Sequence, residues 1–283
     1  MPSLHLPTIP IATACSSCAD PGGRSRGFSL VELAIAIFIM ALLLGSILVP
    51  LQSQVRSRKL DETDRILAQA REALLGYVAA NGYFPCPASS ASNSGQEASP
   101  NHANGTCNAS VTFATAFVGF LPAVALGFTP VDGNGYALDA WGLPQNRIRY
   151  AVANASITTN TLCPVALSNA YTQTNGMRKA TMACIQSLTT LLYVCNTGTG
   201  VTATGCASTT NELADNAIAI VWSLGENAPT GGSAPHEDKN LNNTRVFVLA
   251  PYSTAAGSVF DDQLTWIGPP MLFNRMVSAG MLP

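Results

Sequence analysis

The chain has 283 residues, and its 14 basic and 16 acidic residues give a net charge of −2. A balance this close to neutral leaves no strongly basic surface, so nucleic acid is excluded as the main partner. More than 200 residues follow a single long apolar segment, which is enough to bury a substantial hydrophobic core.

Residues 1–27 combine Pro, Gly and Ser with two arginines, Arg24 and Arg26, just before the apolar segment. Arginines beside a membrane span favour the cytoplasmic side. A secretory signal peptide is cut after its apolar core, whereas the best cleavage signal here lies before it, so we expect the apolar segment to be retained. An uncleaved signal anchor is the alternative. Cys15 and Cys18 have CxxC spacing, but no second cysteine pair or histidine pair supports a metal site.

The apolar segment begins directly after the stretch Arg-Gly-Phe-Ser-Leu-Val-Glu-Leu, residues 26–33. From Phe28 to Leu51 its only ionisable residue is Glu32. A helix of about 24 residues at 1.5 Å per residue is long enough to span a bilayer. A carboxylate in such a helix costs about 2.5–3.5 kcal/mol on membrane-insertion scales. We therefore expect Glu32 to have a partner.

Gly-Phe-Ser-Leu-Val-Glu-Leu followed by an apolar helix resembles the cleavage and methylation signature of type IV prepilins and type II secretion pseudopilins. The resemblance implies that prepilin peptidase cuts after Gly27, removes residues 1–27 as a leader, and methylates the new amino terminus at Phe28. It also implies that Glu32 pairs with the amino terminus of a neighbouring subunit. The mature chain would then carry 12 basic and 15 acidic residues, a net charge of −3.

The function implied by this resemblance is that of a structural subunit, a minor pilin or pseudopilin, of a type IV pilus or type II secretion pseudopilus. Residues 28–51 would lie in the inner membrane as a single span, with the carboxyl-terminal domain in the periplasm, and would later enter the filament core. The implied partners are prepilin peptidase, other pilin or pseudopilin subunits, the inner-membrane assembly platform and, before assembly, membrane lipid. The alternative is a membrane-tethered binding or adhesin module that does not polymerise.

The helix is expected to run from Phe28 to about Asn81, because Asn81-Gly82 is a stop signal with prolines just beyond it. Pro50 removes a backbone hydrogen bond and is expected to bend or loosen the helix. Pilins that resemble this chain often carry a proline in this neighbourhood, where their helices melt in the filament. In residues 52–82 apolar residues recur at three- and four-residue spacing, which predicts an amphipathic continuation that packs on the globular domain.

Residues 83–283 are expected to form a periplasmic or extracellular globular pilin domain. The segments that we expect to form strands are 147–152, 217–224, 245–250 and 260–267. Residues 111–127 fit a short strand and a helical turn, and 181–194 fit a helix or a strand. The predicted fold class is α+β and pilin-like: a long amino-terminal helix packed on a mostly antiparallel β-sheet with disulfide-tied loops.

The stretch Asp139-Ala-Trp-Gly-Leu-Pro144 before the first of these strands resembles a stretch in the globular domain of pseudopilins. The tail, Leu272–Pro283, begins with a helical pattern.

Six cysteines follow the leader: Cys86, Cys107, Cys163, Cys184, Cys195 and Cys206. An even number of cysteines in an exported domain predicts disulfides. Six cysteines allow 15 pairings, and the sequence alone does not choose among them. Closing a short loop costs less entropy than closing a long one. This favours the pairs Cys86–Cys107, Cys163–Cys184 and Cys195–Cys206.

The chain contains no motif that assembles a catalytic site, so we expect no enzymatic activity and assign no catalytic residue. His102 and His236 are the two histidines beyond the leader, and both are expected to be solvated in polar loops. Asp261 and Asp262 are expected to be a solvated strand start or a helix cap. Three tryptophans are expected in the core: Trp141, Trp222 and Trp266.

No cofactor is expected, with calcium as the alternative. Asp132 and Asn134 lie in a Gly-rich turn and have the oxygen ligands that calcium prefers. Major pseudopilins that resemble this chain bind calcium in a loop after a Ser-Leu-Gly segment. The matching segment, Ser223-Leu224-Gly225, implies three further candidates, which are Glu226, Glu237 and Asp238. Two prolines between these residues depart from the family spacing.

Overall fold

The computed structural model describes residues 27–89, 91–107, 111–113, 116–188, 191–230, 234–242 and 244–281. The side chains of residues 46–51, 111–113 and 186 lie outside this description. The expected leader, including Cys15 and Cys18, lies outside the described residues except for Gly27. The chain divides into two compact units, Met1–Ser53 and Gln54–Pro283.

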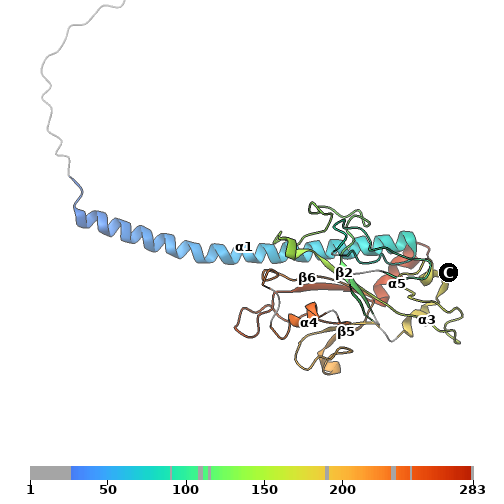
Figure 1. Ribbon diagram of the computed structural model, residues 1–283. Coiled ribbons are helices and arrows are strands. Elements are labelled where there is room, and N and C mark those ends of the chain that lie inside the picture. Colours follow the sequence, from blue (N-terminus) through green and yellow to red (C-terminus); the bar gives the residue numbers. More distant parts are fainter. Residues whose placement is uncertain are drawn as a thin grey trace, which may run out of the picture. The chain divides into compact units, whose positions relative to one another are not determined.

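Helix α1 (Leu30–Asn81) is the longest element among the described residues (Figure 1). Its helical backbone continues through Pro50 without a break. It ends where the sequence predicts, because Gly82 adopts a φ of 78° that glycine reaches without a Cβ clash.

Among the residues whose side chains are described, no helix is long and apolar enough to cross a membrane. The span predicted over 28–51 includes residues 46–51, whose side chains lie outside the description.

Two sheets form the β part of the second unit. The first has five antiparallel strands in the order β1-β2-β3-β6-β8: β1 (Val111–Phe113), β2 (Ala116–Phe120), β3 (Arg149–Ala153), β6 (Ala219–Ser223) and β8 (Gln263–Ile267). The second has the order β5-β4-β7: β5 (Glu212–Ala217), β4 (Leu192–Cys195) and β7 (Val246–Val248). The β4–β7 pair is parallel and every other named pair is antiparallel. The described chain is therefore α+β with a mostly antiparallel sheet arrangement, as predicted.

The remaining elements are short. They are α2 (Gly176–Lys179), α3 (Met182–Gln186), α4 (Asp238–Leu241), α5 (Pro269–Ser278) and single 3-10 turns at Pro144–Asn146 and Thr209–Asn211. Residues 181–194 thus contain both a helix, α3, and the start of a strand, β4. Residues 111–127 contain two short strands, β1 and β2, instead of one, followed by a turn at 123–127 in which the Leu126 N–H donates to the Pro122 carbonyl at 3.1 Å.

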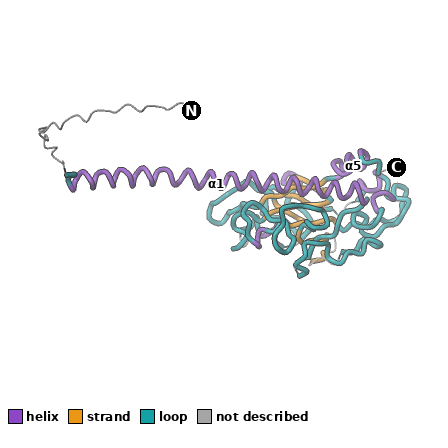
Figure 2. The backbone as a smooth tube through the Cα atoms, turned by 90° about the horizontal axis from the view of Figure 1, so that it is seen from above, coloured by secondary structure: helices purple, strands orange, loops and turns teal. Residues whose placement is uncertain are grey.

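The second half of α1 lies along the five-stranded sheet (Figures 1 and 2). Four residues at helical spacing, Leu67, Ala70, Leu74 and Val78, are almost fully buried and share one core with the sheet. Burying one leucine side chain contributes roughly 1.5–3 kcal/mol. Trp222 of β6 is also buried in this core, whereas Trp141 and Trp266 are half-buried, so the core expectation was right for one tryptophan of three.

Three disulfides tie the loops: Cys86–Cys107, Cys163–Cys184 and Cys195–Cys206. These are the pairs that the short-loop argument favours. Their Cα–Cα distances of 5.4, 4.8 and 5.7 Å lie in the ordinary range for disulfides.

Shortening one of the buried leucines tests the contact between α1 and the sheet. We expect Leu74→Ala to lower the free energy of unfolding by about 2–5 kcal/mol, because it leaves a cavity in a packed core. Val55 lies on the same helix but is exposed, so Val55→Ala should change stability by no more than about 0.5 kcal/mol. Urea unfolding of the purified chain in detergent, followed by circular dichroism, measures both. Equal losses in the two variants would contradict this account of the core.

Candidate functional site

The start of α1 is set by Ser29. The Val31 backbone N–H donates to Ser29 Oγ at 3.3 Å, and the Leu33 N–H donates to the Ser29 carbonyl at 3.1 Å. Serine is a preferred helix cap because its side chain satisfies a backbone donor that the first turn leaves free. Gly27 and Phe28 therefore precede the helix, and Phe28 is 81% exposed. The peptide bond between these two residues lies outside regular secondary structure.

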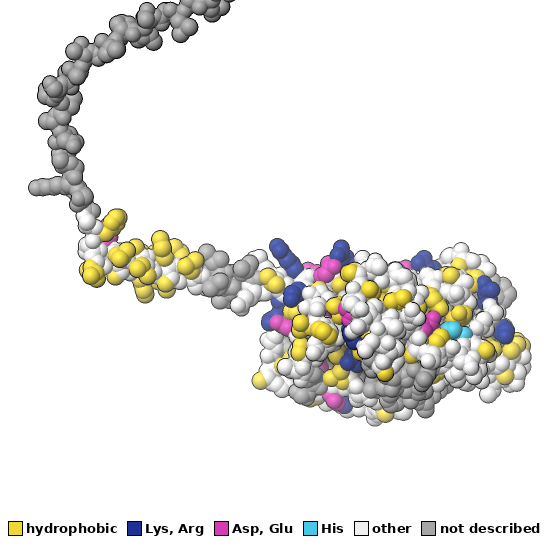
Figure 3. Space-filling model, turned by 45° about the horizontal axis from the view of Figure 1, so that its top comes forward, with side chains coloured by type: hydrophobic (Ala, Val, Ile, Leu, Met, Phe, Trp, Pro, Cys, Tyr) yellow, Lys and Arg dark blue, Asp and Glu magenta, His cyan; other side chains and the backbone are white. Residues whose placement is uncertain are grey.

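Apolar side chains cover the first part of α1 on the face that Figure 3 shows, and exposed apolar residues occupy nearly every helical position from 30 to 44. The large ones that are at least half exposed are Leu30, Val31, Leu33, Ile35, Ile37, Phe38, Ile39, Met40, Leu42, Leu43 and Leu44. A helix that is hydrophobic all round is normally buried in a membrane or in a bundle of helices. Exposed apolar surface of this extent marks an interaction with lipid or with protein.

Glu32 is the one charged residue on this apolar surface, and it lies in the first turn of α1. The first turn favours an acidic side chain, because the helix dipole places partial positive charge there. Among the described residues, no hydrogen bond or ion pair joins the Glu32 side chain. If lipid or protein covers this surface, Glu32 requires a cationic partner from beyond the described residues.

A second group of ionisable residues lies in the second unit. Glu237, Asp261 and Asp262 are each at most 7% exposed, and their carboxylate oxygens lie within 4.8 Å of one another. Glu237 directly precedes α4, and the two aspartates directly precede β8. We call these three residues the acidic cluster. The expectation that Asp261 and Asp262 are solvated is wrong, because the loop before α4 folds over the start of β8.

Two asparagines hold the acidic cluster in place. The Asn227 backbone N–H donates to Asp261 Oδ2 at 2.9 Å, and its side-chain amide donates to Glu237 Oε1 at 2.8 Å. The Asn240 amide donates to Asp262 Oδ2 at 2.7 Å. Asp261 Oδ1 is buried and has no hydrogen-bond partner among the described residues. The acidic cluster is thus rich in acceptors and short of donors.

Burial changes the protonation of the acidic cluster. Burial, together with the negative charge of Glu237, raises the pKa of Asp261 to about 7 and that of Asp262 to about 8. Arg149 is the cation that opposes the shift in the pKa of Asp262. Asp261 and Asp262 therefore hold protons near neutral pH or share a bound cation, and the oxygens of the acidic cluster are the ligand type that calcium and magnesium prefer.

The calcium candidates from the sequence are not brought together. Asp132 Oδ2 pairs with Arg147 Nε at 2.9 Å, and its other oxygen accepts two backbone N–H groups of its turn. Although partial burial raises the pKa of Asp132, these hydrogen bonds and Arg147 outweigh it and lower the pKa. Asn134 supplies one of these backbone donors.

The other candidates are also dispersed. Glu226 pairs with Arg56 at 2.7 Å, and Asp238 lies exposed, 3.5 Å from the Lys239 ammonium. Only Glu237 belongs to the acidic cluster. The sequence signal for Asp261 and Asp262 was an acidic pair directly before an apolar strand.

Both histidines are partly buried, so the expectation that they are solvated is wrong. His102 Nε2 lies 2.9 Å from Glu97 Oε2, and His102 Nδ1 lies 2.8 Å from the Thr172 carbonyl oxygen. Burial lowers the pKa of His102, but the hydrogen bonds to Glu97 and to the Thr172 carbonyl, together with the negative charge of Glu97, outweigh it and raise the pKa above its ordinary value. Cys86 lies beside them but is bonded to Cys107, so this group ties loops together.

His236 has a similar structural contact, because its Nδ1 accepts the Gly198 backbone N–H at 2.7 Å.

Asp139 connects the two segments for which the sequence suggested a resemblance to pseudopilins. Its Oδ2 accepts hydrogen bonds from Ser223 Oγ and from the Asn146 amide, which also donates to the Gly225 carbonyl. Gly225 has a φ of 65°, a conformation that suits glycine. A Cβ added to Gly225 would clash with the Asp261 carbonyl oxygen. Asp139 thus fixes the start of the loop that carries Asn227 and Glu237 to the acidic cluster.

Residues 23–48 match the family described as the prokaryotic N-terminal methylation motif, which is the prepilin-type signature. The match includes the junction at Gly27 and Phe28, Glu32 and the exposed apolar part of α1. No curated protein and no solved structure matches the chain significantly.

The acidic cluster predicts how stability depends on pH. The folded state holds protons on Asp261 and Asp262 up to about pH 7 and 8, whereas the unfolded chain releases them near pH 4. Their contribution to stability is therefore fully present below about pH 4 and is lost as pH rises to about 8. In that window each such carboxyl lowers the free energy of unfolding by up to about 1.4 kcal/mol per pH unit. Urea unfolding between about pH 5 and 9, with a chelator present, measures this slope.

Asp262→Asn is the matching variant, because an amide keeps the shape of the protonated carboxyl without its charge. We expect it to flatten the pH slope and to raise the melting temperature at about pH 8. Asp215→Asn, at an exposed position, is the control and should leave the slope unchanged. A wild-type slope in Asp262→Asn would refute the assignment of the titration to this cluster.

Proposed function

We propose that the chain is a structural subunit, a minor pilin or pseudopilin, of a type IV pilus or type II secretion pseudopilus. The observation that carries the proposal is the prepilin-type signature over residues 23–48, which includes the first part of α1, where the described surface is apolar all round. The α+β domain with a long helix packed on an antiparallel sheet and three disulfides is consistent with a pilin-like fold.

Processing by prepilin peptidase would occur between Gly27 and Phe28. The cut removes residues 1–27 and leaves the Phe28 amino group as the new amino terminus, which the same enzyme methylates. Gly27 has no side chain and Phe28 precedes the helix, so the peptide bond is sterically open to a peptidase.

In this proposal the four parts of the chain have different surroundings. Residues 1–27 are the cytoplasmic leader, and 28–51 span the inner membrane before they enter the filament core. Residues 52–82 continue the helix along the domain, and 83–283 form the periplasmic domain. The inner-membrane assembly platform then moves the subunit out of the lipid.

In this proposal the Glu32 carboxylate makes the filament more favourable than the membrane for the helix. Leaving lipid for a bundle of helices exchanges one apolar environment for another, so packing and polar contacts decide the outcome. A carboxylate buried without a partner is costly, and pairing it with the Phe28 amino group of a neighbouring subunit removes that cost. The pair also fixes the register of neighbouring helices. Pro50 would allow the helix to loosen within the filament.

Gly27→Ala tests the processing site. We expect the leader to stay attached, because an added Cβ obstructs the peptidase at the residue before the cut. A Gly45→Ala variant is the matched control: Gly45 lies inside α1, and its Cβ position also has no neighbour within 4 Å. Immunoblots of cells with and without the peptidase compare the precursor and mature sizes. A mature band in Gly27→Ala would rule out this site.

Glu32→Ala tests assembly. We expect this variant to be processed and to reside in the membrane, but to be lost from sheared filament fractions. The reason is that it lacks the carboxylate that pairs with the amino terminus of the neighbouring subunit. Glu212→Ala, on β5 in the second unit, should assemble normally. Assembly of Glu32→Ala at the wild-type level would instead favour the alternative, a tethered binding module that does not polymerise.

A further inference from the structure

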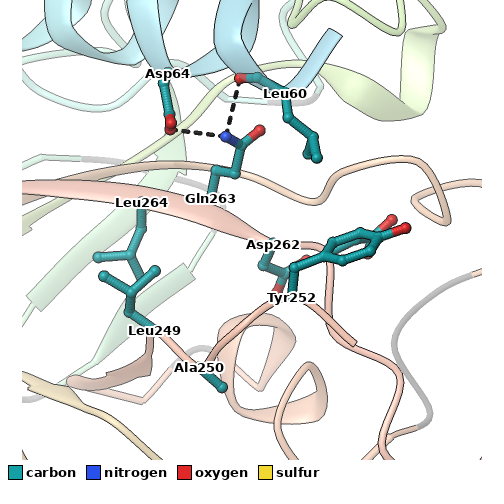
Figure 4. Close-up of a pocket in the computed structure, with 9 residues that line it drawn as sticks. Leu60, Asp64, Leu249, Ala250, Tyr252, Asp262, Gln263 and Leu264 are labelled. Atoms are coloured by element: carbon teal, nitrogen blue, oxygen red, sulfur yellow. Dashed lines mark hydrogen bonds between the residues drawn. The ribbon is translucent and has the colours of Figure 1, made fainter. Parts of the chain in front are cut away.

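An open pocket of about 360 Å³ lies between α1 and the start of β8 (Figure 4). Leu60 and Asp64 contribute from the helix, Asp261 and Asp262 from the start of β8, and Tyr252 from the segment after β7. We call this the acidic pocket. It contains three carboxyls, and none of the described residues that line it is basic.

Two hydrogen-bond acceptors in the acidic pocket receive no hydrogen bond from the described residues. Gln263 donates its amide to Asp64 Oδ1 at 2.7 Å and to the Leu60 carbonyl at 3.0 Å (Figure 4). Gln263 Oε1 and Asp261 Oδ1 are both buried without a hydrogen-bond partner among the described residues. Asp261 and Gln263 both line the pocket, so these two oxygens lie at its inner wall. A ligand that fits here brings positive charge and several N–H groups.

The walls of the acidic pocket suit an arginine side chain. Leu249 and Leu264 offer apolar surface against which the aliphatic stem of an arginine can pack. Tyr252 is 45% exposed and offers a ring face for a guanidinium group. A planar guanidinium carries five N–H donors, enough for carboxylate oxygens and an amide oxygen together.

Arg58 is an arginine without a partner among the residues that the structure describes. Its side chain is exposed, and no hydrogen bond or ion pair joins it to another described residue. Three other cations on α1 are already engaged: Arg56 with Glu226, Arg65 with Glu62 and Lys59 with the Trp141 ring.

The position of Arg58 on the helix keeps it out of its own acidic pocket. It precedes Leu60 by two residues, so it points about 160° away around the helix axis. Along the axis it lies only about 3–9 Å before Leu60 and Asp64. A neighbouring helix that runs parallel, with a small axial shift, can present its Arg58 at the pocket.

We propose that the acidic pocket receives the Arg58 side chain of a second copy of this chain. The arginine and the acidic pocket lie on different sides of α1. Each copy can therefore insert its Arg58 into the pocket of one neighbour and receive the Arg58 of another neighbour in its own pocket. Such a contact is heterologous and extends along a filament instead of closing a dimer. The inference rests on the proposed filament function and adds a contact in the second unit to the one proposed for Glu32.

A charge exchange tests this contact in the full chain expressed with its assembly machinery. Arg58→Glu and Asp64→Arg are each expected to lower incorporation into sheared filaments by about tenfold, because each places like charges at the contact. The double variant restores an ion pair of opposite polarity and is expected to return to within about threefold of wild type. Lys179→Glu alters another exposed cation without a partner among the described residues and should leave incorporation unchanged.

The outcomes separate the inference from the function on which it rests. Normal incorporation of Arg58→Glu, no recovery in the double variant, or an equal loss in Lys179→Glu would overturn the inference alone. Absence of wild-type chain from the filaments would overturn the proposed function and the inference with it.

A second measurement does not depend on the charge-reversed variants. Arg58→Lys keeps the charge and adds an amine that a carbodiimide couples to a carboxylate in contact with it. Cross-linking is expected to produce a ladder of multimers in Arg58→Lys beyond the wild-type background. Mass spectrometry should identify a cross-link between the peptide that carries the introduced amine and a peptide that carries an aspartate of the acidic pocket. The absence of this cross-linked peptide from assembled filaments counts against the contact.

Discussion

The contact between the second half of α1 and the five-stranded sheet is the constraint on which the second unit depends. Leu67, Leu74 and Val78 supply one side of the core, and the buried strands supply the other. The helix therefore has to be amphipathic from about residue 60 onward, although it is apolar all round before residue 46. One continuous helix thus contains two surfaces with different requirements. The first needs partners outside the chain, whereas the second has its partner in the same chain.

The features that follow from local pattern could be predicted from the sequence. Helical spacing and Asn81-Gly82 set the course and end of α1, and alternating or buried apolar runs marked β3, β6, β7 and β8. The cysteine pairs agree with a simple preference for short loops. These predictions succeeded because the information lies within a few residues of the element concerned.

The acidic cluster could not be predicted, because it depends on contacts between distant segments. Asp261 and Asp262 have the composition of a solvated turn, but both are buried, and the loop that follows Gly225 places Asn227 and Glu237 against them. That loop in turn depends on Asp139 and Asn146, which lie far away in the sequence. The sequence did not identify the partners of the calcium candidates for the same reason: Asp132 and Glu226 each pair with an arginine, and Glu237 joins the acidic cluster. The partner of a carboxylate is thus set by the tertiary structure and not by the neighbouring sequence.

The three disulfides share an order along the chain that affects how the protein can be made. Each pair closes before the next begins, so no bond encloses or crosses another. A chain that crosses a membrane from its amino-terminal end exposes its cysteines in the same order. An oxidant that joins each new cysteine to the one just before it therefore produces the native pairs at once. For a chain exported in this way, successive pairing selects one of the 15 possible arrangements without any reshuffling of disulfides.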